Sequence, residues 1–318
     1  MLEFPEKFYE AETREHFLVD ETMKRFWAAE MEVLREIAEI CERHDLTWYV
    51  AYGTLLGAIR HEGYVPWDDD LDIWMKRKDY MKFLRYAEEL PKGYLIQSPM
   101  TEQGYPQYQS CVLNGKSVSV ETKRLQNFHG CPFVVGVDIF PLDELPVSEK
   151  DCEEERQIFD IISTTATMLK KEQRSPEVQE KLLNVLEYLG KECNFTVAPQ
   201  LLAPQRQDDL ISALYRLANE IIIRYEKNGG NQLVMYMDYI NWPSKVYEKE
   251  WFEQVDMATF EGFGVPVPVG YDAILRCTYG NYQVRVRNTS LHGYPMYQKQ
   301  LDQMREILRQ MEEKQQNG

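Results

Sequence analysis

The chain has 318 residues, of which 44% are hydrophobic, and its formal net charge at pH 7 is −16. This apolar content is sufficient for a folded core and excludes an intrinsically disordered chain. The acidity and the absence of a basic stripe exclude a nucleic-acid-binding protein. The sequence has neither a long apolar run nor a signal-peptide pattern, so we expect no transmembrane segment and a cytoplasmic location.

The first part of the chain, residues 20–147, mixes helical and strand-like patterns and is predicted to be an α/β unit. Apolar residues at helical spacing predict helices over 21–43, 55–60 and 78–90. Runs of β-branched and aromatic residues predict strands over 47–52, 71–75, 94–97, 108–113, 118–122 and 133–140. The Asn114-Gly115 pair predicts a hairpin between two of these strands.

The rest of the chain divides into two parts. Residues 148–230 are rich in Glu, Gln, Lys and Leu, which predicts two or three helices that form an insertion. Residues 231–318 are expected to complete the core and to end in a helix. Within this last part we expect strands over 233–239 and 255–261, an extended connector through Pro266 and Pro268, and helices over 271–278 and 295–315.

An acidic run, Asp68-Asp69-Asp70-Leu71-Asp72, leads into the strand predicted over 71–75. Side chains two apart on a strand point to the same face, so Asp70 and Asp72 are expected to project together while Leu71 faces the core. Converging carboxylates repel one another unless a cation compensates, and hard divalent cations prefer oxygen ligands. The pattern predicts a site for Mg²⁺ or Mn²⁺; the alternative is a solvated acidic turn.

Two further features support such a site. Asp138 is a lone acid in an apolar strand, where burial of its charge costs several kcal/mol unless a partner compensates it. A metal is one such partner, and a buried salt bridge or a strand-end turn is the alternative. Gly53 and Thr54 suit an approach to phosphate, because glycine admits close contacts and a helix N-terminus favours anions. The alternative is that this pair only ends the preceding strand and contacts no ligand.

Residues 52–73, YGTLLGAIRHEGYVPWDDDLDI, resemble the signature of the LicD family, which includes bacterial phosphocholine transferases and is related to the fukutin-related proteins. Residues 136–143 resemble the family's second block, and stretches between 260 and 282 resemble its C-terminal block. One departure is Asn281, where family members often have Asp after Tyr-Gly. The resemblance implies a nucleotidyltransferase-like fold, with a mixed sheet, flanking helices and a helical insertion.

The resemblance also implies roles for particular residues. In this superfamily a Gly-Thr turn precedes an Asp-x-Asp strand, and these roles fall on Gly53-Thr54 and on Asp70 and Asp72. Asp138 supplies the third acid, so that Asp70, Asp72 and Asp138 hold the metal. Asp138 or Asp69 is the candidate general base.

The implied activity is Mg²⁺-dependent transfer of phosphocholine, or a similar phospho-alcohol, from a CDP-activated donor to a sugar hydroxyl. The implied acceptor is a cell-surface glycan such as teichoic acid or lipopolysaccharide, free or lipid-linked, which leaves open peripheral contact with the inner face of the membrane. The helical insertion over residues 148–230 is expected on the acceptor side of the site. One alternative is a nucleotidyltransferase that moves NMP from an NTP to a phosphorylated small molecule or sugar. Another is a non-catalytic member that binds glycan or serves as a scaffold.

Basic and aromatic residues near these motifs complete the candidate site. Arginine binds phosphate through two parallel hydrogen bonds, and quaternary ammonium groups are held by aromatic faces. The donor-binding candidates are Arg60, His61, Arg285 and His292. The head-group candidates are Trp67, Trp74, Tyr52 and Tyr64. The alternatives are a surface ion pair for Arg60, a helix cap for His61, and core or rim packing for the aromatic residues.

Overall fold

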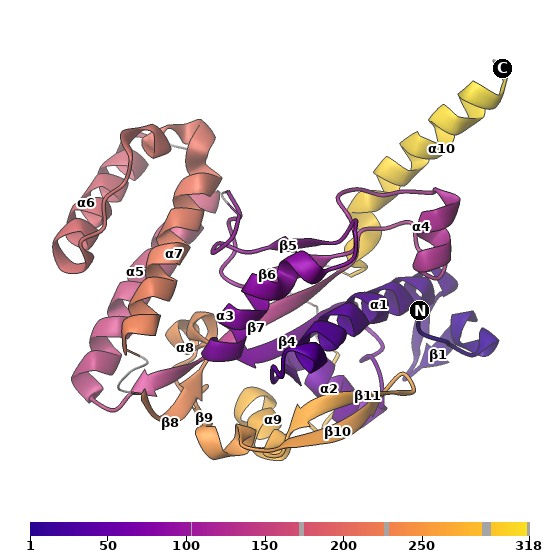
Figure 1. Cartoon of the computed structure of the whole chain (residues 1–318), viewed down its shortest axis with the longest axis horizontal. Coiled ribbons are helices and arrows are strands. Elements are labelled where there is room, and N and C mark those ends of the chain that lie inside the picture. Colours follow the sequence, from indigo (N-terminus) through magenta and orange to yellow (C-terminus); the bar gives the residue numbers. More distant parts are fainter. Residues whose placement is uncertain (103, 172–174, 226–228, 288–293, 317–318) are drawn as a thin grey trace.

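The computed structural model describes residues 1–102, 104–171, 175–225, 229–287 and 294–316. It is a mixed α/β fold built on one twisted sheet (Figure 1). The sheet has the order β3-β4-β7-β6-β5, and β8 joins β7 to β9. These strands are β3 (Tyr49–Val50), β4 (Leu71–Lys76), β5 (Leu95–Gln97), β6 (Ser110–Leu113), β7 (Gly136–Pro146), β8 (Gly229–Val234) and β9 (Tyr247–Glu248). The mixed α/β architecture expected from the sequence is therefore confirmed.

Strand β7 is the centre of this sheet. It runs parallel to β4 and antiparallel to β6, and its last residues pair antiparallel with β8. Two hairpins lie outside the sheet, namely β1 (Glu12–Arg14) with β2 (Phe17–Val19), and β10 (Val255–Phe260) with β11 (Phe263–Pro268). The first hairpin joins the N-terminal segment to the body, and the second packs against helix α2 (Tyr52–His61).

Helices cover the sheet and extend beyond it. Helix α1 (Glu21–Arg43) starts at Asp20, whose side chain accepts a hydrogen bond from the Met23 N–H, and it buries a broad apolar face against β6 and β7. The remaining α-helices are α3 (Arg77–Tyr86), α4 (Thr122–Asn127), α5 (Glu149–Lys171), α6 (Pro176–Cys193), α7 (Gln207–Tyr225), α8 (Tyr236–Asn241), α9 (Tyr271–Tyr279) and α10 (Leu301–Gln316). The 3₁₀ helices are η1 (Glu6–Tyr9), η2 (Ala87–Glu89), η3 (Pro199–Leu202), η4 (Pro204–Arg206), η6 (Lys249–Phe252) and η7 (Met296–Gln300).

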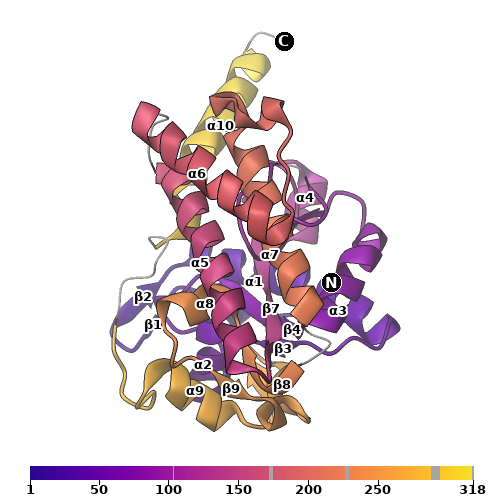
Figure 2. The ribbon, with the colours of Figure 1, turned by 90° about the vertical axis from the view of Figure 1, so that its left-hand side faces the viewer.

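Helices α5, α6 and α7 project together from one end of the sheet, away from α10 (Figures 1 and 2). Helix α5 packs against α7 and α6 and also contacts α8 and β7. The two or three helices expected over 148–230 are therefore present, while the domain boundaries at 147 and 230 stay predictions. No helix in the described part of the chain has an apolar stretch long enough to cross a membrane.

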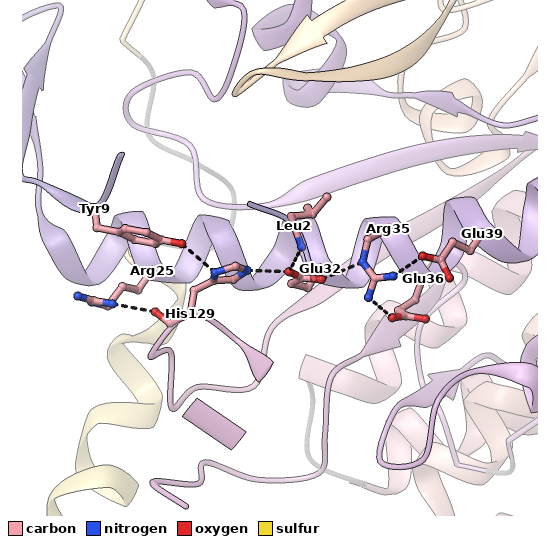
Figure 3. Close-up of polar contacts among 8 residues, drawn as sticks. All are labelled: Leu2, Tyr9, Arg25, Glu32, Arg35, Glu36, Glu39 and His129. Atoms are coloured by element: carbon pink, nitrogen blue, oxygen red, sulfur yellow. Dashed lines mark hydrogen bonds and ion pairs between the residues drawn. The ribbon is translucent and has the colours of Figure 1, made fainter. Parts of the chain in front are cut away.

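The N-terminal segment lies along α1 (Figure 3). The Tyr9 hydroxyl lies 2.8 Å from His129 Nδ1, and His129 Nε2 lies 2.7 Å from Glu32 Oε1. The Leu2 N–H donates to the same Glu32 oxygen at 2.6 Å, and Arg35 donates to the other oxygen at 2.9 Å. This chain of contacts fastens the first ten residues to α1 and to the loop that precedes β7.

Several predictions about local structure are wrong. The hairpin at Asn114 does not form, because the Asn114 side chain accepts from the Val135 N–H at 3.0 Å and from Arg124 at 2.7 Å. A Cβ on Gly115 would lie 2.8 Å from Arg124 Nη1, so this glycine gives room to the guanidinium group and does not form the expected turn. Residues 118–122 accordingly form no strand, and α4 begins at Thr122.

Three other segments differ from expectation. Helix α2 already begins at Tyr52, so Gly53 and Thr54 lie in its first turn and not in a loop. The strand expected over 233–239 ends at Val234, which pairs with Asp143, because the preceding positions of β7 pair with β4 and β6. The connector through the two prolines is strand β11, paired along its length with β10.

Candidate functional site

Asp72 and Asp138 stand opposite each other on neighbouring strands. The parallel register of β4 and β7 pairs Asp72 with Asp138. Leu71 and Ile73 are buried on the core side, as the alternation predicted, whereas Asp70 and Asp72 are half-buried. Gln109 Nε2 donates to Asp138 Oδ2 at 3.3 Å. The sheet thus brings together carboxylates that are 66 positions apart in the chain.

The first turn of α2 holds Asp72 in place through its backbone. The Ala51 N–H donates to the Asp72 carbonyl at 2.9 Å, and the Asp72 N–H donates to Thr54 Oγ1 at 2.9 Å. A Cβ on Gly53 would lie 2.2 Å from Asp68 Oδ2, so only glycine allows the Asp68 carboxylate to approach here. Gly53 and Thr54 therefore build the acidic site, and their contact with a donor phosphate stays a prediction.

Like charges crowd around Asp72. Burial raises the pKa of Asp72 well above its ordinary value, and the carboxylates of Asp70, Asp138 and Asp68 raise it further. Asp238 of α8 contributes to the same effect, and burial raises its own pKa as well, while Lys245 at 3.6 Å opposes that shift. Sequence patterns gave no signal for Asp238, because a strand was expected where α8 forms.

Glu30 of α1 is a second acid that the sequence analysis did not single out. It is fully buried, and burial raises its pKa well above the ordinary value, with further contributions from Asp69 and Asp70. The Tyr64 hydroxyl donates to Glu30 Oε2 at 3.0 Å. Glu30 sits at a helical core position, where local pattern alone predicts packing and not a role beside the acidic run.

The chemistry of this site suits a divalent cation. Carboxylate oxygens are the ligands that Mg²⁺ prefers, and a cation would relieve the repulsion around Asp72. Within the described residues, no three or more His, Cys, Asp or Glu side chains are already arranged to hold a metal ion. The strand register places Asp72 opposite Asp138, so the side chains would have to turn toward a common point to hold an ion, and the metal site of Asp70, Asp72 and Asp138 stays a prediction.

Asp69 faces a different part of the protein from its neighbours. It is fully buried, and its Oδ2 accepts the N–H of Met296, which precedes the terminal helix. The backbone of Asp68 is held by α1, since Trp27 Nε1 donates to its carbonyl oxygen at 3.2 Å. Of the two candidate bases, the half-buried Asp138 is thus the more accessible to a substrate.

Basic residues gather at the far end of α2. Arg60 Nη1 donates to the Tyr282 carbonyl at 2.8 Å, and His61 Nε2 lies 3.0 Å from Glu15 Oε1. Arg285 Nη1 lies 2.7 Å from the same Glu15 oxygen. Burial and the charge of Arg60 lower the pKa of His61 below its ordinary value. His292, the fourth donor-binding candidate, lies outside the described residues.

Tyr279 of α9 links the basic and acidic groups. Burial at its hydroxyl end raises the pKa of Tyr279, and the carboxylates of Asp68 and Asp72 raise it further, although 42% of the residue surface is exposed. Tyr279 also acts electrostatically on Arg60. The phenol is therefore within electrostatic range of both groups.

The aromatic candidates have different surroundings. Trp74 is buried on β4, and its ring lies 4.9 Å from that of Tyr52 in an edge contact. Tyr64 stacks on Trp27 with ring centroids 4.4 Å apart, so one of its faces is already covered. Trp67 is half-buried with its edge toward Phe17. Trp74 follows Asp72 by two positions on β4, and its contact with Tyr52 joins the first turn of α2 to this strand.

Fold and site together define a mixed α/β protein whose central parallel strand pair carries clustered carboxylates beside a helix with glycine in its first turn. Residues 45–176 match the family model described as LicD/FKTN/FKRP, nucleotidyltransferase domain. The chain is therefore similar to the LicD family over this segment.

Two relatives show how far the similarity extends. The chain is 27% identical over 259 residues to the lipopolysaccharide cholinephosphotransferase LicD of Haemophilus influenzae, which covers 79% of this chain and 88% of the relative. It is 33% identical over 86 residues to an uncharacterized protein of Rickettsia typhi, which covers 25% of this chain and 28% of that protein. The similarity to the first relative thus runs through most of both chains.

Proposed function

We propose that this protein is a phosphotransferase that moves phosphocholine, or a similar phospho-alcohol, from a CDP-activated donor to a sugar hydroxyl of a cell-surface glycan. The parallel pairing of β4 with β7 carries the proposal, because it places Asp72 opposite Asp138 at one point of the sheet. The lipopolysaccharide cholinephosphotransferase similar to this chain supports both the transferred group and the glycan acceptor. Teichoic acid is the other acceptor class that we consider.

The carboxylates have two tasks in this proposal. Asp70, Asp72 and Asp138 would hold Mg²⁺ or Mn²⁺, which, when bound, neutralises the charge on the donor's phosphoryl oxygens. Asp138 accepts the proton of the attacking sugar hydroxyl, with buried Asp69 as the alternative base. The new bond joins the sugar oxygen to the phosphorus that carries choline, and the bond from that phosphorus to CMP breaks. The family model's nucleotidyltransferase domain supports a nucleotide-linked donor.

The basic and aromatic residues orient the donor. Arg60, His61 and Arg285 bind phosphate oxygens, for which the guanidinium groups provide paired donors. Half-buried Tyr52 would face the choline group, because aromatic faces attract a quaternary ammonium group, while the fully buried Trp74 packs against the Tyr52 ring. A lipid-linked acceptor would place the reaction at the inner face of the membrane.

The test is an assay of CMP release from CDP-choline with lipopolysaccharide as acceptor and Mg²⁺ present. Asp72→Asn and Asp138→Asn are each expected to lower turnover by about 100-fold or more, since the charge stabilisation they support is lost. Asp256→Asn, at an exposed position of β10, is the matched control and keeps full activity. Wild-type turnover in the Asp72→Asn protein would contradict the proposal.

A nucleotidyltransferase activity is the second candidate, because the matching family model is described by that name. The same carboxylates would serve, but the donor would be CTP, the acceptor phosphocholine and the leaving group pyrophosphate. Incubation with CTP and phosphocholine therefore separates the two activities. Release of pyrophosphate here, without CMP release from CDP-choline, favours the second candidate.

A further inference from the structure

The turn of the β1–β2 hairpin has an unusual composition. Arg14 pairs with Phe17, so the turn consists of Glu15 and His16, which both adopt left-handed backbone conformations with φ values of 50° and 62°. Two-residue turns of this kind usually contain asparagine and glycine, which reach positive φ with least steric conflict. Backbone preference therefore does not explain a glutamate at this position.

The Glu15 side chain points into the basic group. One carboxylate oxygen, Oε1, lies 3.0 Å from His61 Nε2 and 2.7 Å from Arg285 Nη1. The charge of Glu15 also acts on Arg60. The His61 side chain is only 7% exposed, whereas 58% of the Arg285 side chain is exposed. One carboxylate oxygen thus contacts both His61 and Arg285, and Arg60 Nε lies 3.5 Å from the other ring nitrogen of His61, Nδ1.

The hairpin has other anchors that do not involve Glu15. Arg14 donates to both carboxylate oxygens of Glu261, at 2.5 and 3.0 Å. Glu12 forms an ion pair with the buried Lys24 of α1. The residues before the hairpin are held along α1 by the contacts of Figure 3. Attachment of the hairpin to the body therefore does not require the Glu15 carboxylate.

We propose that Glu15 is a built-in anion that occupies a phosphate subsite formed by Arg60, His61 and Arg285, and that a phosphate group of the donor displaces it. The identification of the ligand as a phosphate rests on the proposed function. Carboxylate and phosphate oxygens make similar charge-assisted hydrogen bonds to arginine, so one replaces the other without new donors.

Competition by Glu15 has a measurable consequence. If the carboxylate fills the subsite for about nine-tenths of the time, the apparent affinity for an external anion falls about tenfold. We therefore expect Glu15→Gln to bind inorganic pyrophosphate about tenfold more tightly than the unaltered protein. Calorimetric titration without divalent cations measures this difference, because the carboxylate site then contributes no metal-bound anion.

Controls separate competition from other effects of the substitution. Glu62→Gln removes the same charge from an exposed position beside His61 and is expected to leave the affinity unchanged. Glu15→Asp keeps the charge but shortens its reach, and its affinity is expected to fall between those of the unaltered protein and Glu15→Gln. Arg285→Gln is expected to weaken pyrophosphate binding. Thermal unfolding checks that each variant is folded.

Two results would overturn the inference. Unchanged or weaker binding by Glu15→Gln would mean that the carboxylate only fixes His61 and Arg285 in position. An equal gain in Glu62→Gln would mean a general charge effect. The transfer assay with CDP-choline is scored separately. Tighter pyrophosphate binding by Glu15→Gln without any transfer leaves this inference standing and rejects the proposed function. Transfer without tighter pyrophosphate binding supports the proposed function and rejects this inference.

Discussion

Strand β7 carries two aspartates with opposite surroundings. Asp138, near its start, stands opposite Asp72 and adds to a group of like charges. Asp143, in the second half of the strand, is buried and receives hydrogen bonds from Arg77 Nε at 2.6 Å and Nη2 at 2.9 Å. The same guanidinium donates to Asn219 at 2.6 Å and to the Tyr108 hydroxyl at 3.0 Å.

The charges around Asp138 and Asp143 distinguish a functional acid from a structural one on the same strand. The Asp143 charge is neutralised by a buried partner whose own hydrogen bonds are satisfied, so it links β7 to α3 and α7. Asp138 lies among carboxylates that repel one another, an arrangement which is retained where a ligand supplies the missing positive charge. Substitutions at the two ends should therefore change stability in opposite directions.

The largest change in the free energy of unfolding is expected at the end of β7 where Asp143 pairs with Arg77. Asp143→Ala leaves the Arg77 guanidinium buried without its carboxylate, which should lower the free energy of unfolding by about 3–5 kcal/mol. Urea-induced unfolding followed by circular dichroism measures the change. The double variant Arg77→Met/Asp143→Leu removes both charges and is expected to recover part of the loss. A double variant as unstable as Asp143→Ala would show that shape, and not charge, holds this region together.

Glu155 of α5 sharpens the comparison, because it is a third kind of acid. It is 1% exposed, and burial raises its pKa to about 8, with the nearby charge of Asp143 adding to the shift. The ordinary value is 4.5, so the folded state binds the proton more tightly than the unfolded state. This contribution to stability is complete below pH 4.5 and is lost as the pH rises through about 8.

We therefore expect Glu155→Gln to be more stable than the unaltered protein at neutral pH. The gain should grow between pH 4.5 and about 8 by at most about 1.4 kcal/mol per pH unit. Urea unfolding at pH 5, 6, 7 and 8 measures it, with the exposed Glu154→Gln as the control. A difference that does not change with pH would mean that Glu155 is ionised in the folded protein.

Local sequence pattern was sufficient to predict much of the sheet and the direction in which Asp72 projects. Side-chain periodicity predicts the helix over 21–43 and the strand over 71–75. The same alternation predicts that Asp72 points away from the core. Asp138 could be selected as a lone acid in an apolar strand. Its exact pairing with Asp72 depends on the register between strands distant in sequence, which local pattern does not determine.

Other parts of the site depend on contacts that local pattern does not encode. Glu15 reaches His61 because a hairpin folds back from the N-terminus, and Asp238 approaches Asp72 because β8 ends early. At Asn114-Gly115 the turn preference is overridden by side-chain hydrogen bonds to Arg124 and Val135. In each case a tertiary contact decides the outcome, and sequence spacing gives no information about it.

The smallest stability effect is expected at the crowded end. In protein freed of divalent cations, Asp72→Asn removes one carboxylate from a half-buried group of like charges and keeps the shape of the side chain. We expect the free energy of unfolding to rise by about 0.5–2 kcal/mol, as is common when a strained functional site is relaxed. Asp256→Asn, exposed on β10, is the control and should change little.

Excess Mg²⁺ should make the unaltered protein more stable than Asp72→Asn, because an ion bound by the unaltered carboxylates stabilises only the folded state. A metal-free Asp72→Asn protein less stable than the unaltered one would mean that Asp72, like Asp143, is a structural acid, and the contrast between the two ends of β7 would disappear.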